Sequence, residues 1–188
     1  GFGIKIVLLG SATVGKTSIV NAATKKDVLS DQLPTIGASL VKKEIKIKNL
    51  DVSLNIWDTA GQETYRSLAP LYFRQARVII LVYSVNSKES FDCLNSWYDE
   101  VQEKIEQRPK YVVIGNKIDL ERKVETKEGY DYAKSIDADF FEVSALSNPQ
   151  QISDLFDMVA IDILNQDNAL LQSLKNPGTR ENEGGKCC

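Results

Sequence analysis

The sequence contains no histidine, only three cysteines and no long apolar run, and each of these features excludes a class of protein. Without histidine there is no imidazole general base, no Ser-His-Asp or Cys-His nucleophile pair and no histidine-ligated zinc. Two of the cysteines, Cys187 and Cys188, are adjacent, so we expect no disulfide framework and a reducing compartment. The longest strongly apolar run, residues 78–83, is far shorter than the roughly 20 residues that span a bilayer.

A surplus of basic charge is also missing. The 188 residues include 23 Lys and Arg against 26 Asp and Glu, a net charge of −3. A protein that binds duplex DNA usually carries basic residues for phosphate contacts, so we expect no nucleic-acid partner. The apolar run at residues 4–9 leads into a glycine loop rather than a cleavage site, so we expect no secretory signal. Length and apolar content suit one compact domain.

Short apolar runs alternate along the chain with segments of helical period. Strands are predicted over residues 4–9, 41–47, 52–57, 78–83, 111–114 and 140–143. Helices are predicted from near residue 15, over 90–105, over about 126–135 and over 152–163. The alternation indicates an α/β fold with a mostly parallel, doubly wound sheet, in which residues 41–47 and 52–57 can pair through a turn near residue 48. Ligands bind such sheets at the carboxyl ends of the strands.

The pattern of alternating elements stops near residue 166. Residues 168–175 can extend the last helix, but Asn176-Pro177-Gly178 would end it, and residues 179–186 are polar. We therefore predict a domain over residues 1–166 and a flexible tail over 167–188.

The first strand runs into a glycine loop of the form G-x-x-x-x-G-K-[ST], followed by a predicted helix. The backbone N–H groups of such a loop surround phosphate oxygens, its lysine reaches the β- and γ-phosphates, and its hydroxyl is placed to bind Mg²⁺. The predicted phosphate-binding residues are Gly10, Ser11, Ala12, Thr13, Val14, Gly15, Lys16, Thr17 and Ser18.

Three more strand ends carry polar motifs. Asp58-Thr-Ala-Gly61-Gln62 offers a carboxylate for Mg²⁺, an N–H for a γ-phosphate and an amide that can orient water. Asn116-Lys117-Ile-Asp119 offers a carboxylate that can accept both N1–H and the 2-amino group of guanine, which adenine lacks. Ser144-Ala145 offers a backbone N–H for the guanine O6. Each motif alone could be a plain turn or a polar strand end, but four in chain order indicate a guanine-nucleotide site.

With these motifs the chain resembles a Ras-superfamily small GTPase over about residues 4–165. It is most similar to Rab proteins in residues 35–39, in Ile56-Trp57 and in residues 65–76, where Ser-Leu-Ala-Pro-x-Tyr resembles the early-endosomal subgroup. The resemblance implies a P-loop NTPase G domain, with a six-stranded mostly parallel sheet, one antiparallel edge strand and about five flanking helices. It also implies binding of GTP and GDP with Mg²⁺, and hydrolysis of GTP.

The resemblance further assigns roles to residues of this sequence. Catalytic roles fall on Gln62, Lys16, Thr35 and Gly61, Mg²⁺ binding on Thr17, Thr35 and Asp58, and further nucleotide contacts on Asn116, Lys117, Asp119, Ser144, Ala145 and Leu146. An effector surface is implied at Leu40, Trp57 and Tyr72, and prenylation at Cys187 and Cys188. The implied partners are an exchange factor, a GTPase-activating protein, a GDP dissociation inhibitor or prenylation escort, effectors, and the cytoplasmic face of intracellular membranes, endosomal ones in particular.

Some positions depart from the family pattern. Leu40 stands where Rab proteins commonly have phenylalanine, Val28 occupies the position of an aromatic that stacks on guanine, and Leu146 replaces a lysine. Two functions therefore stay open: a membrane-traffic switch that hydrolyses GTP slowly, and a guanine-nucleotide scaffold that hardly hydrolyses it. A nucleotide kinase would need an acceptor site and a basic lid, and the Asn-Lys-x-Asp motif argues against it.

Overall fold

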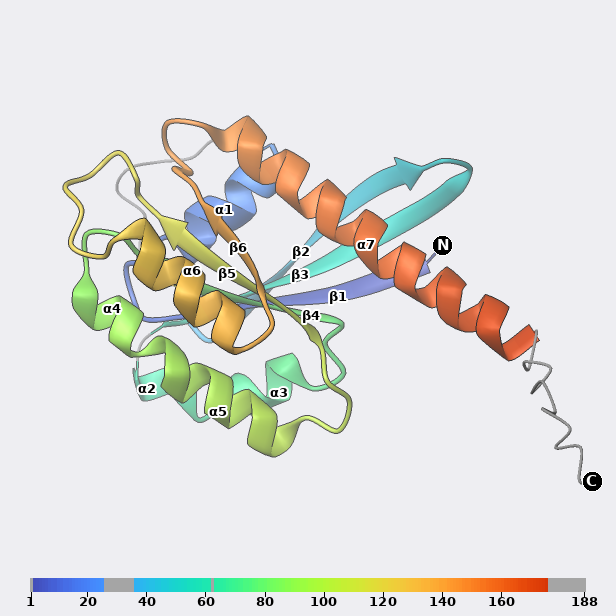
Figure 1. Ribbon diagram of the computed structural model, residues 1–188, viewed down its shortest axis with the longest axis horizontal. Coiled ribbons are helices and arrows are strands. Elements are labelled where there is room, and N and C mark those ends of the chain that lie inside the picture. Colours follow the sequence, from blue (N-terminus) through green and yellow to red (C-terminus); the bar gives the residue numbers. More distant parts are fainter. Residues whose placement is uncertain (1, 26–35, 62, 176–188) are drawn as a thin grey trace, which may run out of the picture.

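The strands form one mixed sheet, as predicted. The computed structural model describes residues 2–25, 36–61 and 63–175, and these residues form a six-stranded sheet in the order β2-β3-β1-β4-β5-β6 (Figure 1). The strands are β1 (Phe2–Leu9), β2 (Ala38–Ile47), β3 (Leu50–Thr59), β4 (Val78–Ser84), β5 (Lys110–Asn116) and β6 (Asp139–Glu142). The β2–β3 pair is antiparallel and the other pairs are parallel, which confirms the expected α/β class with one antiparallel edge strand.

The helices follow the predicted segments, with two additions. They are α1 (Lys16–Ala23), α2 (Glu63–Arg66), α3 (Ala69–Phe73), α4 (Lys88–Asp92), α5 (Leu94–Lys104), α6 (Thr126–Ser135) and α7 (Pro149–Lys175). The helix predicted over residues 90–105 is observed as α4 and α5, which adjoin at Cys93. The additions, α2 and α3, have only 4 and 5 residues, too few for a helical period to show in the sequence.

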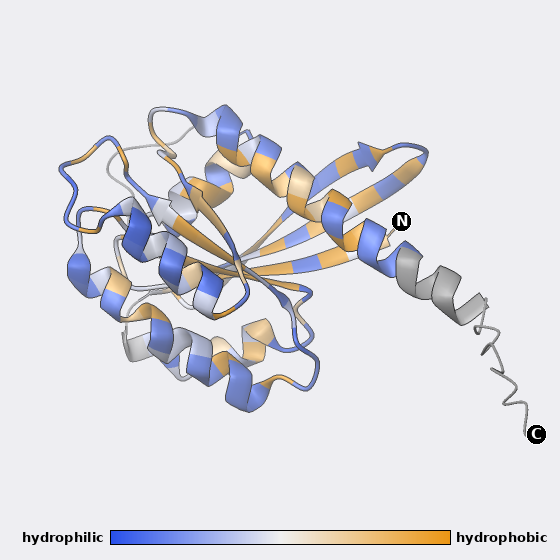
Figure 2. Cartoon of the chain, viewed as in Figure 1, coloured by the Kyte–Doolittle hydropathy of each residue, from blue (hydrophilic) through white to orange (hydrophobic). Residues whose placement is uncertain are grey.

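The sheet separates two apolar layers because successive side chains of a strand point to opposite faces. On one face, Ile4, Ile6 and Leu8 of β1 pack in a cluster with α1 and α7. On the other face, Val7 and Leu9 join a cluster with α3, α5 and α6. Figure 2 shows the apolar central strands between helices whose outer surfaces are polar. Strands buried on both faces explain why residues 78–83 are continuously apolar rather than alternating.

The last helix extends beyond the predicted domain boundary. α7 continues past residue 166 to Lys175, so the helical extension considered for residues 168–175 is present. The boundary at residue 166 remains a prediction. Cys187 and Cys188 lie outside the described residues.

Candidate nucleotide-binding site

The glycine loop lies at the carboxyl end of β1, and its shape requires its first glycine. Gly10 has a φ of 153°, and a Cβ there would lie 2.2 Å from the Val82 carbonyl oxygen of β4. Any side chain would therefore push the loop off the sheet. Because β1 lies in the middle of the sheet, this loop is central among the strand ends.

Lys16 is the first residue of α1 and is buried, with 5% of its surface exposed. Its Nζ donates hydrogen bonds to the carbonyl oxygens of Gly10 at 2.9 Å and Ser11 at 2.8 Å, so the ammonium lies across its own loop. Burial lowers the pKa of Lys16 to about 8, and the negative charge of Asp58 opposes this shift. A buried cation at a glycine loop favours an anionic ligand.

Thr17 and Asp58 meet beside Lys16. Parallel pairing of β1 with β3 places Asp58 opposite Leu8, and the Thr17 hydroxyl donates to the Asp58 carboxylate at 2.6 Å. Asp58 is only 2% exposed. A buried carboxylate beside a hydroxyl supplies the oxygen ligands that Mg²⁺ prefers, and Mg²⁺ sites commonly use one or two protein ligands together with substrate phosphates. In residues 2–25, 36–61 and 63–175 no group of three or more His, Cys, Asp or Glu side chains could hold a metal ion.

Gly61 closes this end of the site. A Cβ on Gly61 would lie 2.5 Å from both the Ala12 nitrogen and the Lys16 Nζ. The backbone after β3 therefore approaches the glycine loop more closely than a side chain would allow. This contact brings the second predicted motif against the first.

Asn116 and Lys117 connect the glycine loop to the far strand ends. The Asn116 side chain donates to the Val14 carbonyl at 2.9 Å and accepts from the Ala145 N–H at 3.2 Å. Lys117 Nζ donates to the Thr13 carbonyl at 2.6 Å. Three motifs that lie apart in the sequence are thus joined by direct hydrogen bonds. Ser144-Ala145 was predicted to offer a backbone N–H to the guanine O6, and the N–H of Ala145 donates to Asn116 in this structure.

Asp119 is held by a side chain whose role the sequence did not indicate. The Ser144 hydroxyl donates to Asp119 Oδ1 at 2.6 Å and accepts from the Ser147 N–H at 3.0 Å. This hydroxyl therefore fixes one oxygen of the carboxylate that we expect to read the base. Leu146 follows in the same loop and is 54% exposed.

The three residues expected at an effector surface lie together. Leu40 is opposite Trp57 in the β2–β3 pairing and is exposed, whereas Trp57 and Tyr72 are half-buried. The rings of Trp57 and Tyr72 have centroids 5.6 Å apart, and Lys5 Nζ lies 5.2 Å from the Trp57 ring centroid. Thr35, Gln62 and Val28 lie outside the described residues, so their predicted roles stay predictions.

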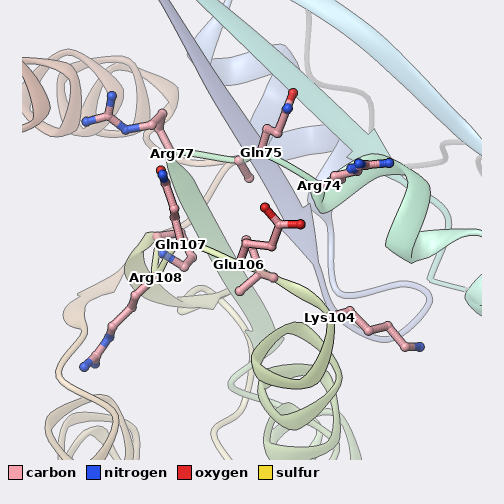
Figure 3. A pocket seen from close by; sticks show the side chains of 10 residues that line it. Arg74, Gln75, Arg77, Lys104, Glu106, Gln107 and Arg108 are labelled. Carbon is pink, nitrogen blue, oxygen red and sulfur yellow. The ribbon is translucent and has the colours of Figure 1, made fainter.

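A separate cavity of about 380 Å³ lies at the opposite end of the sheet, near the amino ends of β4 and β5. Figure 3 shows basic side chains around it that point in different directions. Arg77 reaches Asp167 of α7 at 2.6 Å, and Arg108 lies 3.6 Å from Asp137. The cations are thus largely compensated by carboxylates, and the cavity does not belong to the strand ends described above.

The chain is similar to known proteins over most of its length. The family model described as Ras family matches residues 5–165. Ras-related protein Rab-17 of Mus musculus is 40% identical over 163 residues, covering 85% of this chain and 75% of that protein. Ras-related protein Rab-5A of Dictyostelium discoideum is 40% identical, covering 85% of this chain and 80% of that protein. Ypt/Rab-type GTPase Rab7 of Neurospora crassa is 36% identical, covering 87% of this chain and 83% of that protein.

Proposed function

Because the chain belongs to the Ras family, among the Rab-type small GTPases that hydrolyse GTP, we propose that it is a switch in membrane traffic, which cycles between GDP- and GTP-bound states and recruits effectors while GTP is bound. The observation that carries this proposal is the convergence of Lys16, the Thr17–Asp58 pair and the Ser144–Asp119 pair at one edge of the sheet. The first suits phosphates, the second suits the Mg²⁺ that accompanies them, and the third suits a base.

Asp119 reads the base in this proposal. Its carboxylate accepts N1–H and the 2-amino group of guanine, while Ser144 holds Oδ1 in place. Adenine offers neither donor and would leave the carboxylate unpaired, so ATP should be rejected strongly. Asn116 and Lys117 keep this end of the site attached to the glycine loop through Val14 and Thr13.

The phosphate end combines the glycine loop with residues after β3. Lys16 stabilises negative charge on the β- and γ-phosphates, and the glycine-loop N–H groups surround them. Thr17, Asp58 and Thr35 would hold Mg²⁺, which when bound neutralises charge on the same phosphates. The close approach of Gly61 to the loop supports a role for its N–H at the γ-phosphate.

Hydrolysis is proposed to be slow in the isolated protein. Gln62 would orient the attacking water, and Gly61 and Lys16 would stabilise the departing charge. No arginine occurs between Thr17 and Thr35, where an internal arginine finger could lie. An activating protein would supply that arginine, a contribution of about 10³–10⁵ in rate.

Membrane attachment is proposed to depend on Cys187 and Cys188, each carrying a prenyl group. None of the helices that the structure describes is long and apolar enough to cross a bilayer. A peripheral protein held by two lipid chains on endosomal membranes, and extracted by a GDP dissociation inhibitor, fits the Rab resemblance. An exchange factor would load GTP, and effectors would contact Leu40, Trp57 and Tyr72.

The alternative is a guanine-nucleotide scaffold with little hydrolysis or cycling, which Val28 and Leu40 favour because both depart from the Rab pattern. Single-turnover hydrolysis of bound GTP by the wild type and by Gln62→Leu separates the two functions. A switch should hydrolyse GTP measurably, lose at least about tenfold in Gln62→Leu, and keep its rate in the surface control Gln166→Leu. Equal, negligible rates in all three proteins would support the scaffold.

A further inference from the structure

The two loops that face the base in the proposed function follow neighbouring strands, but the second strand is weakly held. β6 has only 4 residues and forms the edge of the sheet, pairing with β5 alone. A short edge strand positions its following loop poorly unless other contacts hold it. The loop after β6 carries Ser144 and Ala145, so its position decides whether Asp119 and Asn116 are correctly oriented.

A bidentate ion pair joins the chain on both sides of these loops. Arg122 follows Asp119, and Glu142 is the last residue of β6, just before Ser144. The Arg122 guanidinium contacts Glu142 Oε1 at 2.6 Å and Oε2 at 3.1 Å. The side chains are 28% and 16% exposed, so water screens this pair less than an exposed one.

The pair is also fixed from its surroundings. Arg122 donates to the Val124 carbonyl at 2.9 Å, and the Thr126 hydroxyl at the start of α6 donates to Glu142 Oε2 at 2.9 Å. The three bonds to Glu142 thus tie β6 to the segment that leads from Asp119 into α6. A planar guanidinium fork on a carboxylate restricts orientation as well as distance.

Packing beneath the pair leaves little freedom for it to shift. In the register of the sheet, Gly115 of β5 lies between Tyr83 of β4 and Glu142 of β6. Gly115 directly precedes Asn116 in the chain. A Cβ on Gly115 would lie 2.7 Å from the Tyr83 hydroxyl, so the buried ring lies directly against the β5 backbone. Two backbone hydrogen bonds hold the residues that follow. The Val143 N–H donates to the Gly115 carbonyl at 2.8 Å, and the Ile118 N–H donates to the Val143 carbonyl at 3.3 Å.

We propose that the Arg122–Glu142 pair is a positioning element for base recognition: it holds the loop of Asn116 and Asp119 against the loop of Ser144 and Ala145, and so sets both nucleotide release and the preference for guanine. The inference rests on the proposed guanine-nucleotide binding. Neither residue touches the base in this proposal, and they act through the Ser144–Asp119 and Ala145–Asn116 hydrogen bonds. The phosphate end meets this connection through the hydrogen bonds of Asn116 and Lys117 to the glycine loop, whereas Lys16, Thr17 and Asp58 lie on α1 and β3.

The test compares GDP with IDP, whose base keeps N1–H but lacks the 2-amino group. Arg122→Lys keeps the charge but loses the fork, and Glu142→Gln keeps the shape but loses the charge. Each variant should release a fluorescent GDP analogue about tenfold faster, the size expected for losing one charge-assisted hydrogen bond. The affinity ratio of GDP to IDP should fall severalfold, because a displaced Asp119 no longer accepts both donors. Single-turnover hydrolysis of bound GTP should stay within about twofold, since the phosphate end is unchanged.

The matched control is Lys88→Met, which removes an exposed ion pair between α4 and α6, Lys88–Glu128 at 2.6 Å, without touching either loop. It should change neither release nor the GDP-to-IDP ratio. A purely structural role would lower the melting temperature of the Arg122 and Glu142 variants while weakening GDP and IDP equally, and that result would overturn the proposal. If Glu142→Gln fails to fold, Arg122→Lys alone decides. Failure of the wild type to prefer GDP over IDP and ATP would instead refute the proposed function.

Discussion

At the scale of single residues, Lys16 shows how burial prepares a cation for an anionic ligand. Burial lowers its pKa from 10.5 to about 8, so its ammonium costs folding free energy at neutral pH. The unfolded chain holds more protons between these two values, so this cost is relieved as pH rises from about 8 toward 10.5. Phosphate oxygens beside Nζ would offset the cost at neutral pH by stabilising the charged form.

The first prediction concerns proton uptake by Lys16. Because phosphates raise the pKa of this ammonium, binding of GDP just above pH 8 should be accompanied by uptake of part of a proton, and the affinity for GDP should fall as pH rises above about 8. Calorimetric titrations in two buffers of different ionisation enthalpy measure the proton uptake. They are done at pH 8.5, which lies below the range in which guanine itself ionises. Lys16→Met should bind weakly and without uptake. An equal uptake in that variant would contradict the assignment to Lys16.

The second prediction concerns Asp119. In Asp119→Asn the amide oxygen can still accept the Ser144 hydrogen bond, which leaves the amide NH₂ facing the base. An NH₂ donor clashes with the guanine 2-amino group but suits the 2-oxo group of xanthine, so GDP should bind at least about a hundredfold more weakly and XDP should bind better than GDP. Displacement of a fluorescent nucleotide by GDP, XDP and ATP measures the preference. Asp154→Asn, on the surface of α7, should behave as the wild type, and an unchanged GDP preference in Asp119→Asn would rule out base reading by this carboxylate.

At the scale of elements, α6 shows packing overriding helix propensity. It begins with a capping box, in which the Glu125 N–H and the Glu128 carboxylate are bonded at 2.9 Å, yet it contains Gly129, a poor helix former, in its first turns. A Cβ on Gly129 would lie 2.3 Å from the Tyr83 hydroxyl and 2.6 Å from the Phe140 ring. The glycine therefore lets α6 lie close to the sheet, beside the loops that carry Asp119 and Ser144.

The third prediction follows from this contact. Gly129→Ala gains about 1 kcal/mol in helix propensity. The added methyl group, however, must displace the rings of Tyr83 and Phe140 from the helix, at a cost of about 1–3 kcal/mol with further loss of packing at the sheet. The net result should be a less stable protein, measured by urea unfolding with GDP present. Lys134→Ala, at an exposed position of the same helix, should change the free energy of unfolding by less than about 0.5 kcal/mol. A stabilised Gly129→Ala protein would show that the helix can move away from Tyr83 at little cost.

At the scale of the whole molecule, the candidate nucleotide site and the last helix occupy different parts of the sheet. The site is held by the carboxyl ends of the strands, whereas α7 packs on one face of the sheet and its last turns project beyond the sheet, ending at Lys175 (Figure 1). Beyond residue 166 the chain has three basic residues, Lys175, Arg180 and Lys186, against three acidic ones, Asp167, Glu181 and Glu183. This balance leaves no polybasic segment to attract anionic lipids.

The fourth prediction is that membrane residence needs both terminal cysteines. One lipid chain gives only marginal, reversible binding, and stable anchoring takes a second signal. With no polybasic patch to supply it, Cys188→Ser should move the protein mainly to the soluble fraction of fractionated cells, and Cys187→Ser should do the same. Cys93→Ser is the control and should leave the distribution unchanged. Undiminished membrane association of either terminal variant would show that the tail has another anchor.

The sequence by itself determined the order of the six strands and of the longer helices, and the position of the candidate site. Six β-branched or alternating runs and a glycine loop between strand and helix depend on local patterns, so they could be read without long-range contacts. Because the carboxyl ends of parallel strands share an edge, the sequence alone predicts that the motifs at Lys16, Asp58, Asn116 and Ser144 lie together.

Only the tertiary structure decided how those residues are held. The Ser144–Asp119 bond, the Arg122–Glu142 pair and the lowered pKa of Lys16 arise from groups far apart in the chain, and no period or spacing encodes them. The short helices α2 and α3 were missed because one turn lacks a readable period. α3 contacts β3 and α5, and Arg66 of α2 forms an ion pair with Glu100 of α5. Motifs fix which groups are supplied to the site, whereas packing across strands fixes their orientation and charge.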